Sequence, residues 1–443
     1  MFFKRITAII LALAIVFTFA GCGGENTPSI TDETIYLNGV ALEDYYIVVP
    51  NKADEFASSA AEILLNYIND VLDVKITMIT ERTAEKDYEI LIGDTVRDES
   101  KEALDIQIAD DEYFVYSKNN KVIVCGSDFY IGGGVGALIN DYINVGNKNN
   151  KLPDSPTPKK VEFQTPNSVI LMISDGCGVN HIEAAKQDTI EEYIPEKFPN
   201  ITLVNTTNAT GNTTDSAASA TAMSTGVKTT NKFLGKDPAG KNLKNMTELV
   251  HSKGGKVALL TSDNITGATP SAFAVHVDDR SKTDAINLQY DSLKSTGKLQ
   301  YAEGSLGDNL RKRSTEVVCD ISLDGGTFFT MIEETATDAG GHSNDIEVVK
   351  NAVKRFNGVV AFSAVYVTAF PRVALIVTSD HETGGIQNQN GEFVFTTVNH
   401  TSTPVKVFAL GKGTEALTSK ELIENTEIAH FIAAIYGETN FNK

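Results

Sequence analysis

The stretch SVILMISDG, residues 168–176, is an apolar, strand-like run that ends directly before an acidic residue, Asp175. Further strand-like runs are expected in the second half of the chain, at 257–262, 327–332, 374–379 and 404–410. Helical segments lie between them, and buried strands that alternate with helices are typical of a mostly parallel sheet covered on both faces. The sequence from residue 166 on therefore predicts an α/β fold of this kind.

Chemically active side chains follow the ends of several of these runs. In open α/β sheets, ligands gather at the carboxyl ends of the strands. A single acidic residue at such an end is more often a helix cap or part of a solvated loop. Four carboxylates, three histidines and a serine placed together favour one active site instead. These residues are Asp175, Ser216, Glu333, Asp338, His342, Asp380, His381 and His400.

Ser216 is the candidate nucleophile. The segment TDSAASATA, residues 214–222, places it at the start of an alanine-rich stretch with high helix propensity. The free N–H groups and the dipole at a helix start favour an incoming phosphate group. The sequence therefore predicts that Ser216 faces a bound anion.

Residues 166–443 resemble the metal-dependent alkaline phosphatases. The phrases with this resemblance are SVILMISDGCG, TTDSAASATAMSTGVKT, ITGATPSAFAVHVDDR, DAGGHSND, SDHETGG and NHTSTPVKVFALG. The Asp-Ser-Ala phrase differs from sulfatases, which use a modified Cys or Ser, and from nucleotide pyrophosphatases, which usually have Thr. The resemblance implies an alkaline-phosphatase-like fold and a phosphomonoesterase that acts through a phosphoserine, for phosphate scavenging outside the cell.

The resemblance also implies roles for individual residues. One zinc would be held by Asp338, His342 and His400. A second zinc, facing Ser216, would be held by Asp175, Asp380 and His381. One magnesium would be held by Asp175, Thr269 and Glu333, and Arg280 would bind two phosphate oxygens. The donor types agree, since imidazole and carboxylate suit zinc, an all-oxygen set suits magnesium, and a guanidinium fits phosphate with two hydrogen bonds.

Several residues do not match these positions. Four histidines are expected on the surface or in the core: His181, His251, His276 and His430. Cys177 is expected to pack rather than react. Only 53 positions separate Arg280 from Glu333, which is shorter than is typical of the family, and the stretch from His381 to His400 is also short.

The first half of the chain is expected to form a smaller α/β domain, residues 28–145, followed by a polar, proline-containing linker, residues 146–165. Its pattern, with the phrase EILIGDT, resembles the α/β domain at the N-terminus of some bacterial secreted glycoside hydrolases, which implies carbohydrate contact. The glycine-rich segment 132–136 fits a plain strand-to-helix turn better than a dinucleotide-binding turn.

The N-terminus predicts export. Lys4 and Arg5 precede an apolar run, residues 6–20, which is shorter than the roughly 20 residues that a bilayer span needs. The ending at Gly21 and Cys22 resembles a bacterial lipobox, so residues 1–22 are expected to be a lipoprotein signal peptide and Cys22 a lipid anchor at the cell surface. Simple secretion and an uncleaved anchor are the alternatives. The other cysteines, Cys125, Cys177 and Cys319, are expected to be buried thiols.

Charge limits the choice of partners. The chain has 38 basic and 58 acidic residues, a net charge of −20, which argues against nucleic-acid binding. A phosphate ester must then be attracted by local cations, which metal ions would supply. Two other functions remain open: a phosphodiesterase of the same superfamily, and a catalytically weak surface lipoprotein that binds carbohydrate or phosphoglycan.

Overall fold

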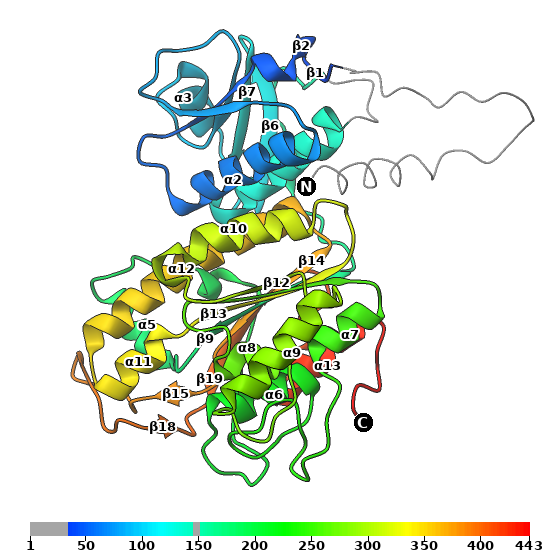
Figure 1. Cartoon of the computed structure of the whole chain (residues 1–443). Coiled ribbons are helices and arrows are strands. Elements are labelled where there is room, and N and C mark those ends of the chain that lie inside the picture. Colours follow the sequence, from blue (N-terminus) through cyan, green and yellow to red (C-terminus); the bar gives the residue numbers. More distant parts are fainter. Residues whose placement is uncertain (1–33, 145–150) are drawn as a thin grey trace, which may run out of the picture.

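The computed structural model describes residues 34–144 and 151–443 (Figure 1). The predicted leader, residues 1–22, lies outside these residues and stays a prediction. Within the described ranges, none of the helices combines the length and apolar character that a membrane span requires. Two mixed sheets organise this part of the chain, one in each half.

The larger sheet has eight strands. In spatial order they are β12 (Tyr301–Glu303), β11 (Lys256–Thr261), β13 (Phe328–Glu334), β9 (Ser168–Ser174), β14 (Val373–Thr378), β19 (Val405–Leu410), β10 (Asn200–Asn205) and β20 (Leu422–Glu424). Neighbours from β12 to β14 are parallel, and β19 is antiparallel to both of its neighbours. The prediction of a mostly parallel sheet is therefore confirmed.

Both faces of this sheet are covered by helices, as predicted. Along β9, Ile170 and Met172 enter one hydrophobic core, and Val169, Leu171 and Ile173 enter the other. The first face is covered by α5 (Val179–Lys186), α10 (Leu310–Ile321) and α12 (Ile346–Ala369). The second is covered by α6 (Ser216–Thr225), α7 (Met246–Ser252), α8 (Ala268–Ala272), α9 (Thr283–Ser295) and α13 (Asn425–Ile435) (Figure 1).

The smaller sheet has six strands in the order β4 (Thr77–Thr80), β3 (Tyr46–Val49), β5 (Glu89–Ile92), β7 (Lys121–Gly126), β6 (Glu112–Lys118) and β8 (Lys159–Lys160). Its helices are α2 (Glu55–Asn66), α3 (Asp98–Leu104) and α4 (Ile131–Ala137). Strand β8 comes from the segment predicted as a linker and pairs with β6, and Leu152 of the same segment is buried. Part of this segment therefore lies along the smaller sheet.

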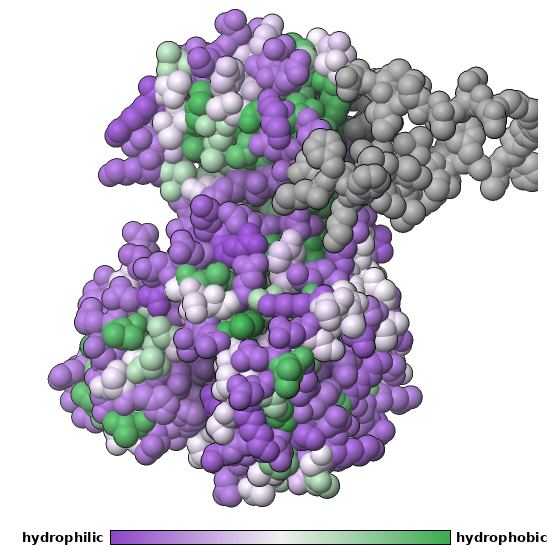
Figure 2. All heavy atoms as spheres, in the orientation of Figure 1, coloured by the Kyte–Doolittle hydropathy of each residue, from purple (hydrophilic) through white to green (hydrophobic). Residues whose placement is uncertain are grey.

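Helix α12 joins the two halves. It packs against the large sheet on one side and against α2 and α4 on the other, and one hydrophobic core runs through all of them. The Thr368 hydroxyl donates to the Phe129 carbonyl at 2.7 Å, and Arg311 of α10 pairs with Glu55 of α2 at 3.0 Å. Figure 2 shows a mostly hydrophilic surface around this junction, with apolar residues in small separate patches.

The glycine-rich segment makes this helix contact possible. A Cβ atom on Gly132 would lie 2.1 Å from the carbonyl oxygen of Val365, and one on Gly136 would lie 2.4 Å from that of Ala369. Both glycines are in helix α4. Their spacing of four residues places them on one face of the helix, where the backbone of α12 approaches closely. The segment is thus a helix-packing surface rather than the turn that the sequence suggested.

Replacing Gly136 with alanine is expected to lower the free energy of unfolding by about 1 to 3 kcal/mol, because the added methyl group meets a backbone oxygen that cannot move away. Gly358→Ala in α12 is the matched control. Its Cβ would meet nothing closer than 3.8 Å, and alanine's higher helix propensity is expected to raise stability by up to about 1 kcal/mol. Denaturant unfolding measures both, and equal stability of the two variants would contradict the close contact.

Candidate active site

The predicted site residues meet at the carboxyl edge of the large sheet. Asp175 directly follows β9, Glu333 lies near the end of β13, and Asp380 comes two residues after β14. These three strands are parallel neighbours, so their ends bring the carboxylates together. All three side chains are buried.

One group of possible metal ligands consists of Asp338, His342 and His400. Helix α11 (Ala336–Ser343) positions the first two, which lie four residues apart on one face of the helix. His400 comes from the short strand β18 (His400–Thr401). The Nε2 atoms of His342 and His400 are 3.1 Å apart. The carboxylate of Asp338 lies 3.3 Å from Nε2 of His342 and 3.5 Å from Nε2 of His400.

Backbone carbonyls fix the orientation of both rings. His342 Nδ1 lies 2.6 Å from the carbonyl oxygen of Val398, and His400 Nδ1 lies 3.1 Å from that of Thr214. If each Nδ1 donates its proton to the carbonyl, the Nε2 lone pairs are free and point toward Asp338. This is the arrangement that histidine ligands of a metal ion usually have.

The second group consists of Asp175, Asp380 and His381, all buried. His381 Nε2 lies 3.2 Å from Asp380 Oδ2 and 3.6 Å from Asp175 Oδ1. Asp175 Oδ1 and Asp380 Oδ2 are buried without a hydrogen-bond partner among the described residues. Because an unpaired buried carboxylate oxygen is costly, these two oxygens suit a bound cation. The rings of His381 and His400 stack at 3.7 Å, so the two groups are adjacent.

Burial and charge shift the pKa values of the second group. Burial, followed by the charges of Asp380 and Asp338, raises the pKa of Asp175 well above its usual range. Burial raises the pKa of Asp380 as well, and it lowers the pKa of His381 far below its usual value. These shifts disfavour the charged forms of the two carboxyl groups and of the imidazole. Divalent cations bound at this edge would favour ionised carboxylates, and they would bind the imidazole in its neutral form.

Glu333 and Thr269 are two further buried residues with side-chain oxygen atoms. Burial raises the pKa of Glu333 to about 7, with the Thr261 hydroxyl acting in the opposite direction. The Thr269 hydroxyl, in helix α8, is buried without a hydrogen-bond partner in the described part of the chain. These oxygens match the donors that magnesium prefers.

Ser216 is the first residue of helix α6, and its Oγ lies 3.3 Å from Nε2 of His381. Asp215 caps the helix by accepting from the N–H of Ala218. The same aspartate lies 3.5 Å from the guanidinium of Arg280, whose side chain is 38% exposed. Ser216 is therefore buried beside the second group of ligands. The partly exposed Arg280 lies beside Asp215, the residue before this serine.

Two functional residues were missed by the sequence analysis. The Thr383 hydroxyl donates to Asp338 Oδ1 at 2.5 Å and lies 3.1 Å from His381 Nδ1, so it connects the two groups. Asp215 both caps α6 and orients Arg280. A cap could have been predicted from the position of Asp215 before the helix, whereas nothing in the sequence around Thr383 indicates its bridging position.

His181 and His276, expected on the surface or in the core, are not part of either group of possible metal ligands. His181 is fully buried, with Nδ1 accepting from the N–H of Gly178 and Nε2 donating to the carbonyl of Thr383. His276 lies near Glu248 at 3.2 Å. Cys125, Cys177 and Cys319 are buried free thiols, as predicted, and burial raises the pKa of Cys177 to about 12.

Known proteins resemble this part of the chain. A family model for alkaline phosphatase matches residues 166–326. Alkaline phosphatase 4 of Bacillus subtilis is 26% identical over 308 residues, which cover 54% of this chain and 66% of that protein. Alkaline phosphatase 3 of the same organism is 25% identical over 283 residues, covering 49% and 61%. The chain thus spans 66% and 61% of these two relatives.

A solved structure gives the same result for the fold. Alkaline phosphatase from the Antarctic bacterium TAB5 is 25% identical, with a TM-score of 0.57, and the match covers 63% of this chain and 100% of that one. Sequence, fold and the cluster at the sheet edge all agree with one another. The second half of the chain is therefore similar to alkaline phosphatases in sequence and in fold.

Proposed function

We propose that this protein is a metal-dependent phosphomonoester hydrolase that acts through a phosphoserine at Ser216 and releases phosphate from organic esters outside the cell. The observation on which this rests is the position of Ser216 Oγ, buried at the start of a helix and 3.3 Å from Nε2 of His381, beside two groups of metal-type ligands.

The ligand sets fit three metal ions. Asp338, His342 and His400 would hold one zinc, and Asp175, Asp380 and His381 would hold a second. Asp175, Thr269 and Glu333 would hold a magnesium. When bound, these cations would lower the pKa of the serine hydroxyl and stabilise negative charge on the leaving oxygen and the phosphoryl group. A TAB5 alkaline phosphatase mutant, 25% identical to this chain, has Mg bound in its M3 site.

The proposed reaction has two steps, and both take place at phosphorus. Ser216 Oγ attacks phosphorus, the bond from phosphorus to the ester oxygen breaks, and the alcohol leaves with a proton. Water next attacks phosphorus, the bond to Ser216 breaks, and the serine regains a proton as phosphate forms. The N-terminus of α6 and the guanidinium of Arg280 bind the non-bridging oxygens in both steps.

Substrate preference tests this proposal. We expect purified protein to hydrolyse p-nitrophenyl phosphate much faster than bis(p-nitrophenyl) phosphate, and to lose both activities after treatment with a chelator. Adding zinc and magnesium back should restore them. Faster turnover of the diester would indicate a phosphodiesterase, and no turnover of either ester with all metals present would contradict an enzymatic role.

Arg280→Ala is expected to lower kcat/KM and weaken inhibition by inorganic phosphate together, each by roughly 10- to 100-fold. Substrate and product present the same oxygens, and each charge-assisted hydrogen bond contributes about 1.5 to 3 kcal/mol, partly replaced by water. Arg280→Lys should recover only part of the loss, because an ammonium group lacks the planar fork. Lys282→Ala, an exposed nearby cation paired with Asp278, is the control. Unchanged phosphate inhibition in Arg280→Ala would contradict the assigned contact.

Thr383→Val is expected to weaken zinc binding by about 10-fold while keeping the side chain's shape. The variant loses the hydroxyl that orients Asp338 and His381, although its backbone N–H can still donate to the Gly176 carbonyl. Zinc content after dialysis against a chelator measures the effect, and Thr383→Ser should restore it. Equal zinc retention in Val and Ser variants would mean that the hydroxyl has no positioning role.

A further inference from the structure

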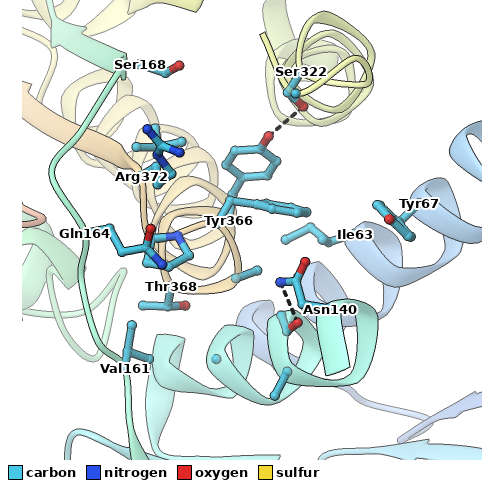
Figure 3. Close-up of a pocket in the computed structure, with 18 of the residues that line it drawn as sticks. Ile63, Tyr67, Asn140, Val161, Gln164, Ser168, Ser322, Tyr366, Thr368 and Arg372 are labelled. Carbon is cyan, nitrogen blue, oxygen red and sulfur yellow. Dashed lines mark hydrogen bonds between the residues drawn. The ribbon is translucent and has the colours of Figure 1, made fainter. Parts of the chain in front are cut away.

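A cavity of about 1010 Å³ opens between the two halves of the chain (Figure 3). Ser168 and Val373 line it at the beginning of β9 and β14, whereas the proposed catalytic residues follow the ends of these strands. The seven residues of β9 span about 20 Å. A small ester bound at Ser216 does not reach this cavity, so the groups that recognise its alcohol part must lie around the start of α6.

Lys232 lies beside this helix start. Its N–H donates to Asp215 Oδ2 at 3.0 Å, and its carbonyl oxygen accepts from the N–H of Arg280 at 2.9 Å. The guanidinium of Arg280 lies 3.5 Å from the same Asp215 oxygen. The main chain of Lys232 is therefore held about two hydrogen-bond lengths from the group that is proposed to bind phosphate.

The backbone of Lys232 has a conformation that lysine rarely adopts. Its φ is 75°, in the left-handed region that favours glycine. The residue takes the third position of a turn, which the N–H of Phe233 closes by donating to the carbonyl oxygen of Thr230 at 3.2 Å. Glycine or asparagine is usual where this position has a positive φ. Because such conformations are concentrated at functional sites, the lysine here indicates a role for its side chain.

The positive charge of Lys232 is available to a ligand. The side chain is exposed, and no hydrogen bond or ion pair involves its ammonium group in the described part of the chain. Lysines close to it in sequence or on the Arg280 segment differ in this respect. Lys228 pairs with Glu424 at 3.0 Å, and Lys282 pairs with Asp278 at 2.6 Å.

Asp279 is an acidic residue close enough to be affected by this charge. Its pKa is lowered mainly by hydrogen bonds from Ser281 and, to a smaller extent, by the charge of Lys232. The N–H of Ser281 donates to Asp279 Oδ1 at 2.9 Å, so this carboxylate already has a partner. In a chain with a net charge of −20, an unpaired cation beside the phosphate site attracts anions that the surface as a whole repels.

We propose that Lys232 binds a second negative charge on the substrate, so that the preferred substrates are phosphomonoesters whose alcohol part carries a carboxylate or a further phosphate. This inference rests on the proposed function and names its substrate class. Arg280 and the start of α6 would bind the phosphoryl group that reacts. The flexible stem of Lys232 would bring its ammonium group, a compact point charge, to the other anionic group.

Two pairs of monoesters test the proposal on the metal-loaded protein. 3-Phosphoglycerate differs from glycerol 3-phosphate by a carboxylate, and fructose 1,6-bisphosphate differs from fructose 6-phosphate by a phosphate. The parent is expected to favour the more highly charged member of at least one pair by about 3- to 5-fold in kcat/KM, as for an exposed ion pair. This preference should decrease at high salt, which screens exposed charges. The pair that shows it identifies the second group as carboxylate or phosphate.

Lys232→Gln should lose this preference, and Lys232→Arg should keep it. Because the bisphosphate has two groups that can react, its preference is measured against that of Lys232→Gln. Lys282→Gln is the matched control, since it removes an equal charge from an exposed lysine near Arg280, and it should keep the preference. Lys232→Gly suits the left-handed conformation, so it should lose the preference while its melting temperature equals or exceeds that of the parent.

Equal kcat/KM for the two members of both pairs in the parent would overturn the proposal. A preference that survives in Lys232→Gln and Lys232→Gly would also overturn it, as would an equal loss in Lys282→Gln, because overall charge would then explain the effect. Absence of turnover for all four esters with zinc and magnesium present is a different result. It would show that the proposed function itself is wrong, and this inference with it.

Discussion

Replacing Ser216 with alanine is expected to lower kcat for p-nitrophenyl phosphate by roughly 10³-fold or more. The hydroxyl is the only group at the start of α6 that can form the covalent intermediate we propose, since the next two residues are Ala217 and Ala218. The loss should appear in kcat rather than in phosphate binding, because Arg280 and the helix N-terminus remain. Metal content and melting temperature should not change.

Ser224→Ala is the matched control for this variant. Ser224 is also a buried serine of α6, but its hydroxyl accepts from the N–H of Met246, far along the helix. It should keep parental turnover, with some loss of stability. If Ser216→Ala turned over substrate at the parental rate, direct attack by water would replace the phosphoserine mechanism.

His342→Ala and His400→Ala are each expected to remove about one zinc per chain and lower kcat by roughly 10²-fold or more. Their Nε2 atoms are 3.1 Å apart and face the same carboxylate, Asp338, so both changes disrupt one ion. The double variant should therefore be little worse than either single variant, because residues that hold one ion act as a unit.

His276→Ala provides the comparison for both variants. Its ring is mostly buried and lies beside Glu248, outside either group of ligands. Metal analysis should find the parental zinc content in His276→Ala and the reduced content in the other two. Full zinc in His342→Ala and His400→Ala would refute the shared site.

The core of the large sheet could be predicted because its strands are buried on both faces. β9, β13 and β14 are wholly buried, which gives continuous apolar runs in the sequence. Strands β10, β12 and β20 were not predicted. β12 and β20 have three residues each, and β10 alternates between buried and exposed positions, so hydrophobicity alone does not separate them from loops.

Part of the candidate site could also be predicted from the sequence, and part could not. Asp175 and Asp380 follow strands and were predictable by position. The contacts that orient them were not, because they depend on loops. The hydrogen bond from Thr383 of β15 (Glu382–Thr383) to Asp338 of α11 joins residues 45 positions apart, which only the folded chain brings together. Likewise, the contact of Gly132 with α12 joins residues more than 200 positions apart.

The most direct test of the central claim is to trap the intermediate. The protein, loaded with zinc and magnesium, is mixed with p-nitrophenyl phosphate and quenched in acid within milliseconds to seconds, and its peptides are analysed by mass spectrometry. The account predicts one phosphoryl group on the peptide that contains Ser216, located on that serine and lost when the quench follows substrate exhaustion. Rapid turnover with no phosphorylated Ser216, or with the phosphoryl group on another residue, would contradict it.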